Sequence, residues 1–209
     1  MNDRFNQVLS RYRERLEREN RLSETLDEAT LAARRNEFLL HVGEDVARVL
    51  HALIIARKAK RIIELGTSYG YSTLFLADAA RETGGVLMTF EIDERKQRYA
   101  RGEIEAAGLG AQVEWHRGDA TELLKRVEGP FDFVLIDLWK DLYVPCFETL
   151  YPKLAEHALV AADNILKPVH FRRDTEAYRA AVRAKPDLQS VLLPIGQGIE
   201  LSCVWRKPH

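Results

Sequence analysis

Oxygen-bearing side chains and one amine stand directly after two apolar segments in the second half of the chain. Asp137 follows the apolar segment Phe131–Ile136, and Asp163 and Asn164 follow a later one. Two carboxylates and an amide oxygen are hard oxygen ligands of the kind that Mg²⁺ prefers. Lys140 lies three residues beyond Asp137, where a turn can bring its amine to the same place. These residues predict an amine beside a divalent metal site, provided that the two segments are neighbouring strands.

A glycine-containing turn, Glu64-Leu65-Gly66-Thr67-Ser68-Tyr69-Gly70-Tyr71-Ser72, follows an earlier apolar segment and precedes a helical one. Backbone N–H groups in such a turn can approach a ligand closely. A dinucleotide-binding turn would read Gly-x-Gly-x-x-Gly, but position 68 is Ser and the third glycine is missing, which disfavours NAD. Ser72 stands at the helix start, where it either caps the helix or donates to a carboxylate of the ligand.

Two further acids end the next two apolar segments. Glu91 comes 25 residues after Gly66, where a carboxylate can accept hydrogen bonds from ribose hydroxyls. Asp119 precedes Ala120, and a helix cap is the simpler interpretation of an acid at that place. Because the glycine turn, Glu91 and Asp119 close three successive strands, we expect all three at the carboxyl edge of one sheet, where open α/β folds bind ligands.

The elements that must position these residues alternate along the chain. Helical segments separate the first six of seven strand-like segments, which predicts a mainly parallel α/β sheet, doubly wound and covered on both faces. The last two strands are joined by residues 194–198, too short for a crossover, so the final strand must be antiparallel. The expected strands are Arg61–Leu65, Val86–Phe90, Gln112–Trp115, Phe131–Ile136, Ala158–Ala162, Leu188–Leu193 and Ile199–Trp205, and the helices between the first six are Tyr71–Arg81, Glu94–Ala107, Ala120–Val127, Val144–Leu154 and Asp174–Ala184.

The N-terminal part reads as a helical extension, residues 1–35, before the main domain, residues 36–209. Phe5, Val8, Leu9, Tyr12 and Leu16 recur at helical spacing amid charges. This apolar stripe needs a partner, either the flank of the domain or a second subunit, and we expect a homodimer. A second helical region is expected over Glu37 to Arg57.

Composition excludes several classes of protein. The 209 residues suit one α/β domain, and 46% apolar residues are ample for its core. A net charge of −1 gives no general electrostatic attraction to nucleic acid. No apolar run approaches the ~20 residues that span a bilayer, and neither a secretory nor a mitochondrial leader is recognisable. We therefore expect a cytoplasmic protein without a membrane partner. Cys146 and Cys203 are expected to be structural thiols.

Two motifs carry a resemblance to known enzymes. Glu-x-Gly-x-x-x-Gly-x-Ser, from Glu64 to Ser72, resembles the first motif of class I S-adenosylmethionine-dependent methyltransferases. The stretch from Ile136 to Tyr143, with Asp163-Asn164, resembles the cation-dependent O-methyltransferases, the family of catechol O-methyltransferase and its bacterial relatives. The likeness covers residues 38–205. It implies a Rossmann-like fold, S-adenosylmethionine and Mg²⁺ or another divalent cation as cofactors, and methyl transfer to a hydroxyl of a catechol-like small molecule.

The resemblance also implies roles for single residues. Asp137, Asp163 and Asn164 fall on metal-ligand positions, and Lys140 on that of the general base. The acceptor positions are Lys140, Asn164, Glu200, which would contact a second hydroxyl, and Phe38, which would flank the acceptor ring. Together with the turn and strand ends above, the expected cofactor-binding residues are Val42, Glu64, Gly66, Ser68, Gly70, Ser72, Glu91, Ile92, Asp119, Ala120, Asp137 and Trp139.

Two other functions remain open. Some bacterial members of this family methylate a nucleoside hydroxyl of tRNA, and a basic strip at the mouth of the site would favour that substrate. A cofactor-binding protein without catalysis would lack the base or a metal ligand, yet all four residues are present. Lys167, Arg172 and Arg173 follow the metal loop, either as solvated charges or as a site for an anionic part of the acceptor.

Overall fold

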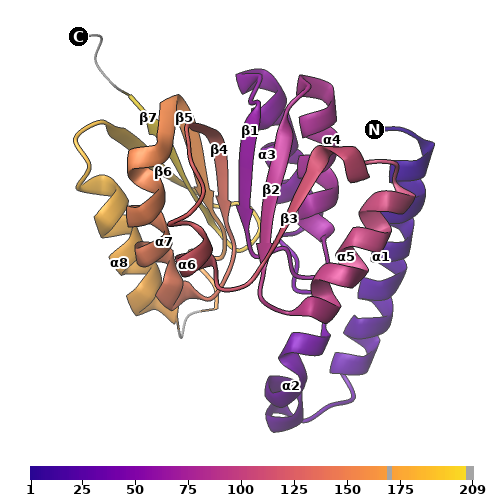
Figure 1. Ribbon diagram of the computed structural model, residues 1–209. Coiled ribbons are helices and arrows are strands. Elements are labelled where there is room, and N and C mark those ends of the chain that lie inside the picture. The colour runs from indigo at the N-terminus through magenta and orange to yellow at the C-terminus, as the bar shows by residue number, and fades with distance from the viewer. Residues whose placement is uncertain (169–170, 206–209) are drawn as a thin grey trace.

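In the computed structural model, which describes residues 1–168 and 171–205, the strands form one mixed sheet (Figure 1). Its order is β3-β2-β1-β4-β5-β7-β6. Only β7 runs antiparallel to its neighbours, β5 and β6. The predicted mainly parallel α/β sheet with an antiparallel last strand is confirmed. The strands are β1 Arg61–Leu65, β2 Val86–Glu91, β3 Val113–Arg117, β4 Phe131–Ile136, β5 Leu154–Ala162, β6 Leu188–Leu193 and β7 Ile199–Val204.

Helices cover both faces of the sheet, as Figure 1 shows. Side chains of α1, α3, α4 and α5 form one apolar cluster with β1, β2 and β4, while those of α6, α7 and α8 form a second with the opposite face. The helices are α1 Asp3–Ser23, α2 Glu28–Arg34, α3 Glu44–Arg57, α4 Tyr71–Thr83, α5 Glu94–Ala106, α6 Ala120–Leu123, α7 Tyr143–Leu150 and α8 Arg172–Arg183, with short 3₁₀ turns η1 Arg35–Glu37, η2 Gly110–Gln112, η3 Lys140–Leu142 and η4 Tyr151–Lys153.

The register of the central strands brings the chemistry-bearing residues to one edge. Leu65 pairs with Ile136, so the residues after β1 and β4 leave the sheet side by side. Ile136 in turn pairs with Ala162, which puts Asp137 next to Asp163. Three predicted strand boundaries, those of β1, β4 and β6, agree with the structure at both ends, because turn residues bound each apolar segment.

The stripe of α1 is covered by the domain itself. Phe5, Val8, Leu9 and Tyr12 are all buried in the first apolar cluster. The ring of Phe5 makes an edge contact with Phe75 of α4, with 5.2 Å between ring centroids. The first of the two partners expected from the sequence is therefore present, and the stripe no longer argues for a second subunit.

The region before α3 differs from the expected helix over Glu37 to Arg57. The helix begins at Glu44, and the residues between Phe38 and Gly43 are not helical. Gly43 takes a φ of 87°, in the left-handed region that favours glycine, and so separates the helix from the preceding segment. α2 was not expected at all, and none of its residues is buried. Within the described residues, no helix combines the length and apolar character needed to cross a bilayer.

Candidate active site

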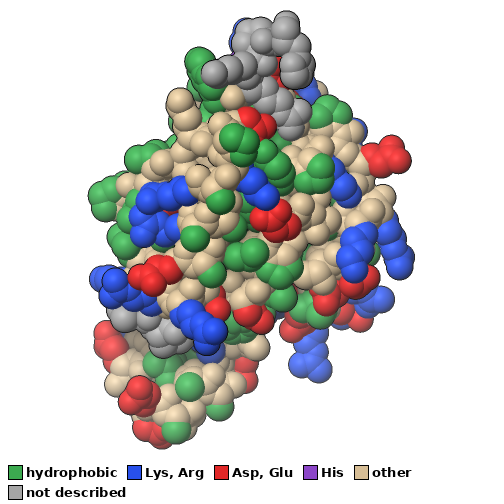
Figure 2. Space-filling view, turned by 90° about the vertical axis from the view of Figure 1, so that its left-hand side faces the viewer, with side chains coloured by type: hydrophobic (Ala, Val, Ile, Leu, Met, Phe, Trp, Pro, Cys, Tyr) green, Lys and Arg blue, Asp and Glu red, His purple; other side chains and the backbone are tan. Residues whose placement is uncertain are grey.

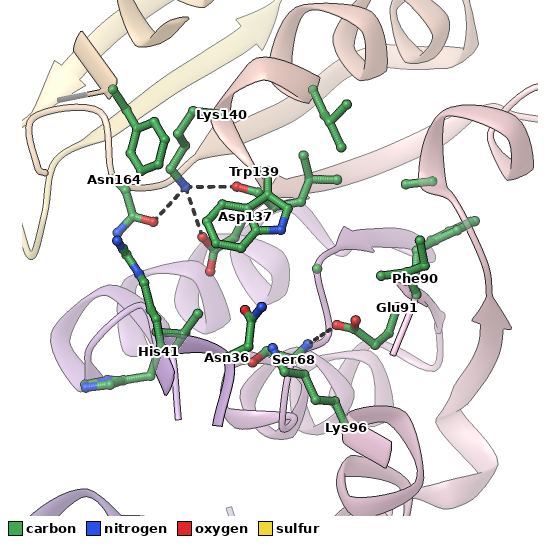
Figure 3. A pocket seen from close by; sticks show the side chains of 18 of the residues that line it. Asn36, His41, Ser68, Phe90, Glu91, Lys96, Asp137, Trp139, Lys140 and Asn164 are labelled. Carbon is green, nitrogen blue, oxygen red and sulfur yellow. Dashed lines mark hydrogen bonds and ion pairs between the residues drawn. The ribbon is translucent and has the colours of Figure 1, made fainter. Parts of the chain in front are cut away.

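A cavity of about 800 Å³ opens at the carboxyl edge of the sheet, and Figure 3 shows its principal side chains. Residues from the ends of β1, β2, β3, β4 and β5 line it, together with the segment before α3 and the loop between β6 and β7. Ten of the predicted site residues are among its lining: Gly66, Ser68, Glu91, Ile92, Asp119, Ala120, Asp137, Trp139, Lys140 and Asn164.

The glycine turn forms one side of this cavity. Gly66 has a φ of 101°, and a Cβ added there would lie 2.1 Å from the carbonyl oxygen of Asp137. Only glycine therefore lets the loop after β1 pass the loop after β4 at this distance. The Ser68 N–H donates to one carboxylate oxygen of Glu91 at 2.8 Å, and the Asp93 N–H donates to the other at 2.9 Å. These two bonds fix the Glu91 carboxylate at the cavity wall, as Figure 3 shows for Ser68.

Glu64 lies beneath the turn rather than in the cavity lining. It is fully buried, and its carboxylate accepts hydrogen bonds of 2.6 Å from the hydroxyls of Ser72, Thr73 and Thr89. Burial raises the pKa of Glu64 to about 7, although the three hydroxyl donors oppose that shift. Gly70 and Val42 also lie outside the lining. Ser72 likewise lies outside the lining, where its hydroxyl donates to Glu64.

Asp119 is a helix cap, the simpler of the two interpretations of its place in the sequence, and it also faces the cavity. Its carboxylate accepts hydrogen bonds from the N–H and the hydroxyl of Thr121, at 2.8 and 2.7 Å, and thereby caps α6. The same two donors lower the pKa of Asp119. Asp119 also lines the cavity. Asp119 thus caps α6 and lines the cavity just after the end of β3.

The amine of Lys140 lies at the opposite end of the cavity, and Figure 3 shows it between Asn164 and Asp137. Its Nζ donates to Asn164 Oδ1 at 2.8 Å and lies 3.6 Å from Asp137 Oδ1. It also donates to the Tyr143 hydroxyl at 2.6 Å and to the Leu138 carbonyl at 3.1 Å. Burial lowers the pKa of Lys140, and the charges of Asp137 and Asp163 oppose that shift.

Asp163 is the most unusual group of the site. It is 1% exposed, and within the described part of the chain neither carboxylate oxygen has a hydrogen-bond partner. Burial, followed by the charge of Asp137, raises the pKa of Asp163 to about 8. Burial raises the pKa of Asp137 as well. A buried carboxylate without a donor is costly unless a cation or a proton compensates it.

These residues fit a hard divalent cation. Two carboxylates and the amide oxygen of Asn164 would leave further positions for water or a ligand, as Mg²⁺ requires. The unpartnered oxygens of Asp163 are the structural observation that supports such an ion. Within residues 1–168 and 171–205, no group of three His, Cys, Asp or Glu side chains is arranged to hold a metal, so Asn164 is needed to complete the set.

Two predicted acceptor residues are not part of the cavity lining. Glu200 is fully buried in β7, where its carboxylate accepts from Arg179 at 2.9 Å and Arg183 at 3.0 Å, both on α8. The Ser190 hydroxyl donates to it as well, at 2.8 Å. Phe38 is half-buried beside the cavity without lining it. Contact of either residue with the acceptor would require a rearrangement.

Several lining residues were not predicted as site residues. Arg35, Asn36 and His41 come from the segment between α2 and α3, and Gln197 from the β6–β7 loop. The Gly43 N–H donates to His41 Nδ1 at 3.0 Å, so in a neutral ring the proton is on Nε2. Lys96 on α5 is 7% exposed, and its Nζ lies 5.6 Å from the centroid of the Tyr69 ring. Only His41 had a sequence signal, its place beside Val42.

Comparison with known families settles the class of protein to which this cavity belongs. A family model described as "O-methyltransferase" matches residues 14–204, most of the chain. The chain belongs to the O-methyltransferase family. The predicted membership in the class I S-adenosylmethionine-dependent O-methyltransferases is thereby confirmed.

Individual relatives agree with that assignment. A catechol O-methyltransferase of Niastella koreensis is 33% identical over 132 residues, which cover 61% of this chain and 59% of that protein. Caffeoyl-CoA O-methyltransferase 2 of Zea mays is 30% identical over 186 residues, covering 78% of this chain and 69% of that protein. The O-methyltransferase TomG of Streptomyces achromogenes, solved in complex with S-adenosylmethionine, superimposes with a TM-score of 0.75 at 26% identity, covering 87% of this chain and 92% of that one.

Proposed function

We propose that this O-methyltransferase requires a divalent metal ion and transfers the methyl group of S-adenosylmethionine to a hydroxyl of a catechol-like small molecule. The observation that carries the proposal is the pair of unpartnered Asp163 oxygens beside Asp137, Asn164 and the Lys140 amine. The names of the relatives, which include a catechol and a caffeoyl-CoA O-methyltransferase, support the same chemistry.

The cofactor would occupy the end of the cavity formed by β1, β2 and β3. Glu91, held by two backbone N–H groups, still has free lone pairs for ribose hydroxyls. Ile92 and Trp139 are 70% and 46% exposed at the cavity, where they would cover the two faces of an adenine ring. The cavity volume of about 800 Å³ suits a nucleoside together with a small acceptor.

Lys140 would accept the proton of the acceptor hydroxyl while the oxygen attacks the methyl carbon. The lowered pKa of Lys140 favours this role, since a base works best when its pKa approaches the working pH. S-adenosylmethionine supplies the electrophilic methyl group, and a divalent ion held by Asp137, Asp163 and Asn164 supplies positive charge that favours an ionised hydroxyl. The remaining contribution of the protein is to hold the donor and the acceptor in line.

The face of the molecule displayed in Figure 2 gives no support to an RNA acceptor. Figure 2 shows basic and acidic side chains interspersed over the face that it displays, without a continuous basic area. Proteins that bind nucleic acid usually concentrate Lys and Arg on one face. Two adjacent hydroxyls suit a cation site with several open positions, which favours a vicinal diphenol over a single phenol.

Radiolabelled S-adenosylmethionine tests this proposal with four acceptors: a catechol, a caffeoyl thioester, the matched monophenol, and unmodified tRNA. We expect transfer to the first two, dependent on Mg²⁺ and abolished by chelator. Asp163→Asn should remove metal-dependent turnover. Asp132→Asn should not, because this carboxylate lies outside the cavity lining, where it accepts from the N–H groups of Lys60 and Arg61 and lies 3.9 Å from Arg57. Unchanged transfer in excess chelator would refute the metal, and preferred transfer to tRNA would refute the acceptor class.

The homodimer expected from the sequence stays a prediction. The apolar stripe of α1 no longer supports it, because the domain itself covers that stripe. Light scattering at micromolar concentration tests it directly, and a monomer would refute it.

A further inference from the structure

Tyr143 lies directly behind the Lys140 amine and has no role in the chemistry described so far. It is the first residue of α7 and is fully buried. Its hydroxyl accepts a hydrogen bond from Lys140 Nζ at 2.6 Å and donates its own proton to the Asp163 carbonyl at 3.0 Å. One buried hydroxyl therefore joins the amine to the backbone of the loop that carries Asp163 and Asn164.

The directions of these bonds restrict the amine. A carbonyl oxygen can only accept, so the single proton of the Tyr143 hydroxyl must point at Asp163. Tyr143 then offers Lys140 only a lone pair, as does the Leu138 carbonyl at 3.1 Å. Both of these acceptors hold N–H groups of Lys140. The remaining side of the nitrogen faces Asn164 and Asp137, which line the cavity.

A neighbouring tyrosine shows that this apolar cluster does not require a buried tyrosine hydroxyl to be hydrogen-bonded. Tyr178 on α8 is also fully buried and packs edge-on against Tyr143, with 5.5 Å between ring centroids. Among the described residues, the Tyr178 hydroxyl has no hydrogen-bond partner. The cluster thus contains two buried phenol rings in contact, and only one of them has its hydroxyl bonded to the amine.

We propose that Tyr143 is a positioning residue for Lys140: its hydroxyl fixes Nζ relative to the Asp163–Asn164 loop and turns the side of the nitrogen that faces Asn164 and Asp137 toward the acceptor. The inference rests on the proposed role of Lys140 as the base. Without the hydroxyl, the amine keeps its cavity contacts but loses its shortest bond on the protein side, so it would occupy several positions. Turnover would fall, whereas acceptor and cofactor would bind as before.

Tyr143→Phe and Tyr178→Phe form a matched pair, because each removes one hydroxyl from the same apolar cluster. With a catechol acceptor and Mg²⁺, we expect Tyr143→Phe to lower kcat about 10- to 100-fold, the effect of losing a hydrogen bond to a charged group. Its KM for the acceptor and Kd for S-adenosylmethionine should stay within about twofold of the parent protein, the split expected when only the transition state is affected. Tyr178→Phe should leave kcat within about twofold.

A second measurement does not depend on activity. Competitive acetylation of the metal-free protein, read by mass spectrometry, reports the reactivity of Lys140 relative to the surface residue Lys125. Tyr143→Phe should change that ratio severalfold and Tyr178→Phe should not, because only the first removes an acceptor of Nζ. If the parent protein methylates no catechol, the proposed function fails, and the acetylation ratio still tests the contact.

Unchanged kcat and an unchanged acetylation ratio in Tyr143→Phe would overturn the inference. Equal losses of kcat in the two variants would also overturn it, since the effect would then belong to the apolar cluster. If Tyr143→Phe does not fold, 3-fluorotyrosine at position 143 keeps the ring and hydroxyl while weakening the acceptor. A smaller fall in kcat at unchanged KM would then support the role, and no fall would refute it.

Discussion

The two ends of the cavity differ in how far the protein satisfies its own polar groups. At the end formed by β1 and β2, the carboxylates are already bonded: Glu64 accepts from three hydroxyls and Glu91 from two backbone N–H groups. At the end formed by β4 and β5, Asp163 has no donor among the described residues, and the pKa of Lys140 is lowered by burial. The carboxylates of the first end have donors, although the buried Ser68 hydroxyl beside them has no partner among the described residues, whereas Asp163 at the second end has no donor at all there.

Binding and chemistry therefore have separate structural requirements at this one edge of the sheet. A preformed wall binds its ligand without reorganisation, which favours affinity. A buried acid without hydrogen-bond partners favours exchange of its proton for a cation, which favours reactivity. Substitutions at the two ends should therefore change different measured quantities.

The largest expected effect is that of Lys140→Met. Turnover should fall about 10²- to 10⁴-fold, the usual contribution of a positioned proton acceptor, while cofactor binding stays nearly intact. Lys153→Met is the matched control, because the Lys153 amine donates only to the carbonyls of Leu124 and Val127, away from the cavity. Steady-state kinetics and calorimetry give the two quantities. Retained turnover in Lys140→Met would show that the ion alone suffices to ionise the acceptor.

At the other end, Glu64→Gln should alter the pH dependence of stability. The pKa of Glu64 is about 7 in the folded protein against an ordinary 4.5, so the folded state binds the proton more tightly. The stabilising contribution of this group is full below about pH 4.5 and is lost as the pH rises to 7. Over that range the parent should lose on the order of 3 kcal/mol relative to Glu64→Gln. Denaturant unfolding at several pH values measures it, with the surface variant Glu82→Gln as control, and parallel curves for parent and Glu64→Gln would contradict the shift.

Glu91→Ala should affect binding and spare the chemical step. Loss of the carboxylate should weaken cofactor affinity by about 1–3 kcal/mol, the range for hydrogen bonds to charged groups. At saturating cofactor, kcat should remain within a few-fold of the parent value. Calorimetry measures the cofactor affinity, and initial rates give kcat. Glu94→Ala removes an exposed acid three residues further along the chain and so controls for the lost charge. A fall in kcat without a change in affinity would break the proposed separation of the two ends.

The smallest expected effect concerns the uptake of Mg²⁺. Because the pKa of Asp163 is about 8 without an ion, binding at pH 7 should release about one proton, and affinity should rise by up to about tenfold per pH unit below pH 8. Calorimetry in buffers of different ionisation heat measures the released protons. No release, with affinity independent of pH, would show that Asp163 is already ionised before the ion binds.

The strands were predictable from sequence because their apolar segments are short and end at turn residues. β4 is the clearest example, with both ends at the predicted positions, Phe131 and Ile136. The ends of β2 and β4 then predicted which residues would reach the cavity, Glu91 and Asp137, whereas Asp163 after β5 lies just outside the lining. α2 was missed because a helix without buried residues has no apolar periodicity. The start of α3 was missed because Val42 continued an apolar pattern across Gly43.

The parts of the site that come from distant segments could not be predicted in this way. Strand order says nothing about which loop returns over the cavity, so Arg35 and Gln197 carried no signal. The resemblance placed Glu200 beside the acceptor, but Arg179 and Arg183 lie on a helix that packs against it and neutralise it. Such a pairing depends on tertiary packing, which no local pattern contains. The missing donors of Asp163 likewise became visible only in three dimensions.

The contact between Gly66 and the Asp137 carbonyl has a consequence for engineering this enzyme. Because one added methyl group would collide with the loop after β4, no library that diversifies position 66 can leave the position of Asp137 unchanged. Attempts to change which acceptor the enzyme methylates should therefore keep Gly66 and substitute the lining residues that come from distant loops, Arg35, Asn36 and Gln197. Those residues belong to loops that the sheet register does not constrain, so new side chains there can be selected without disturbing the groups that perform the reaction.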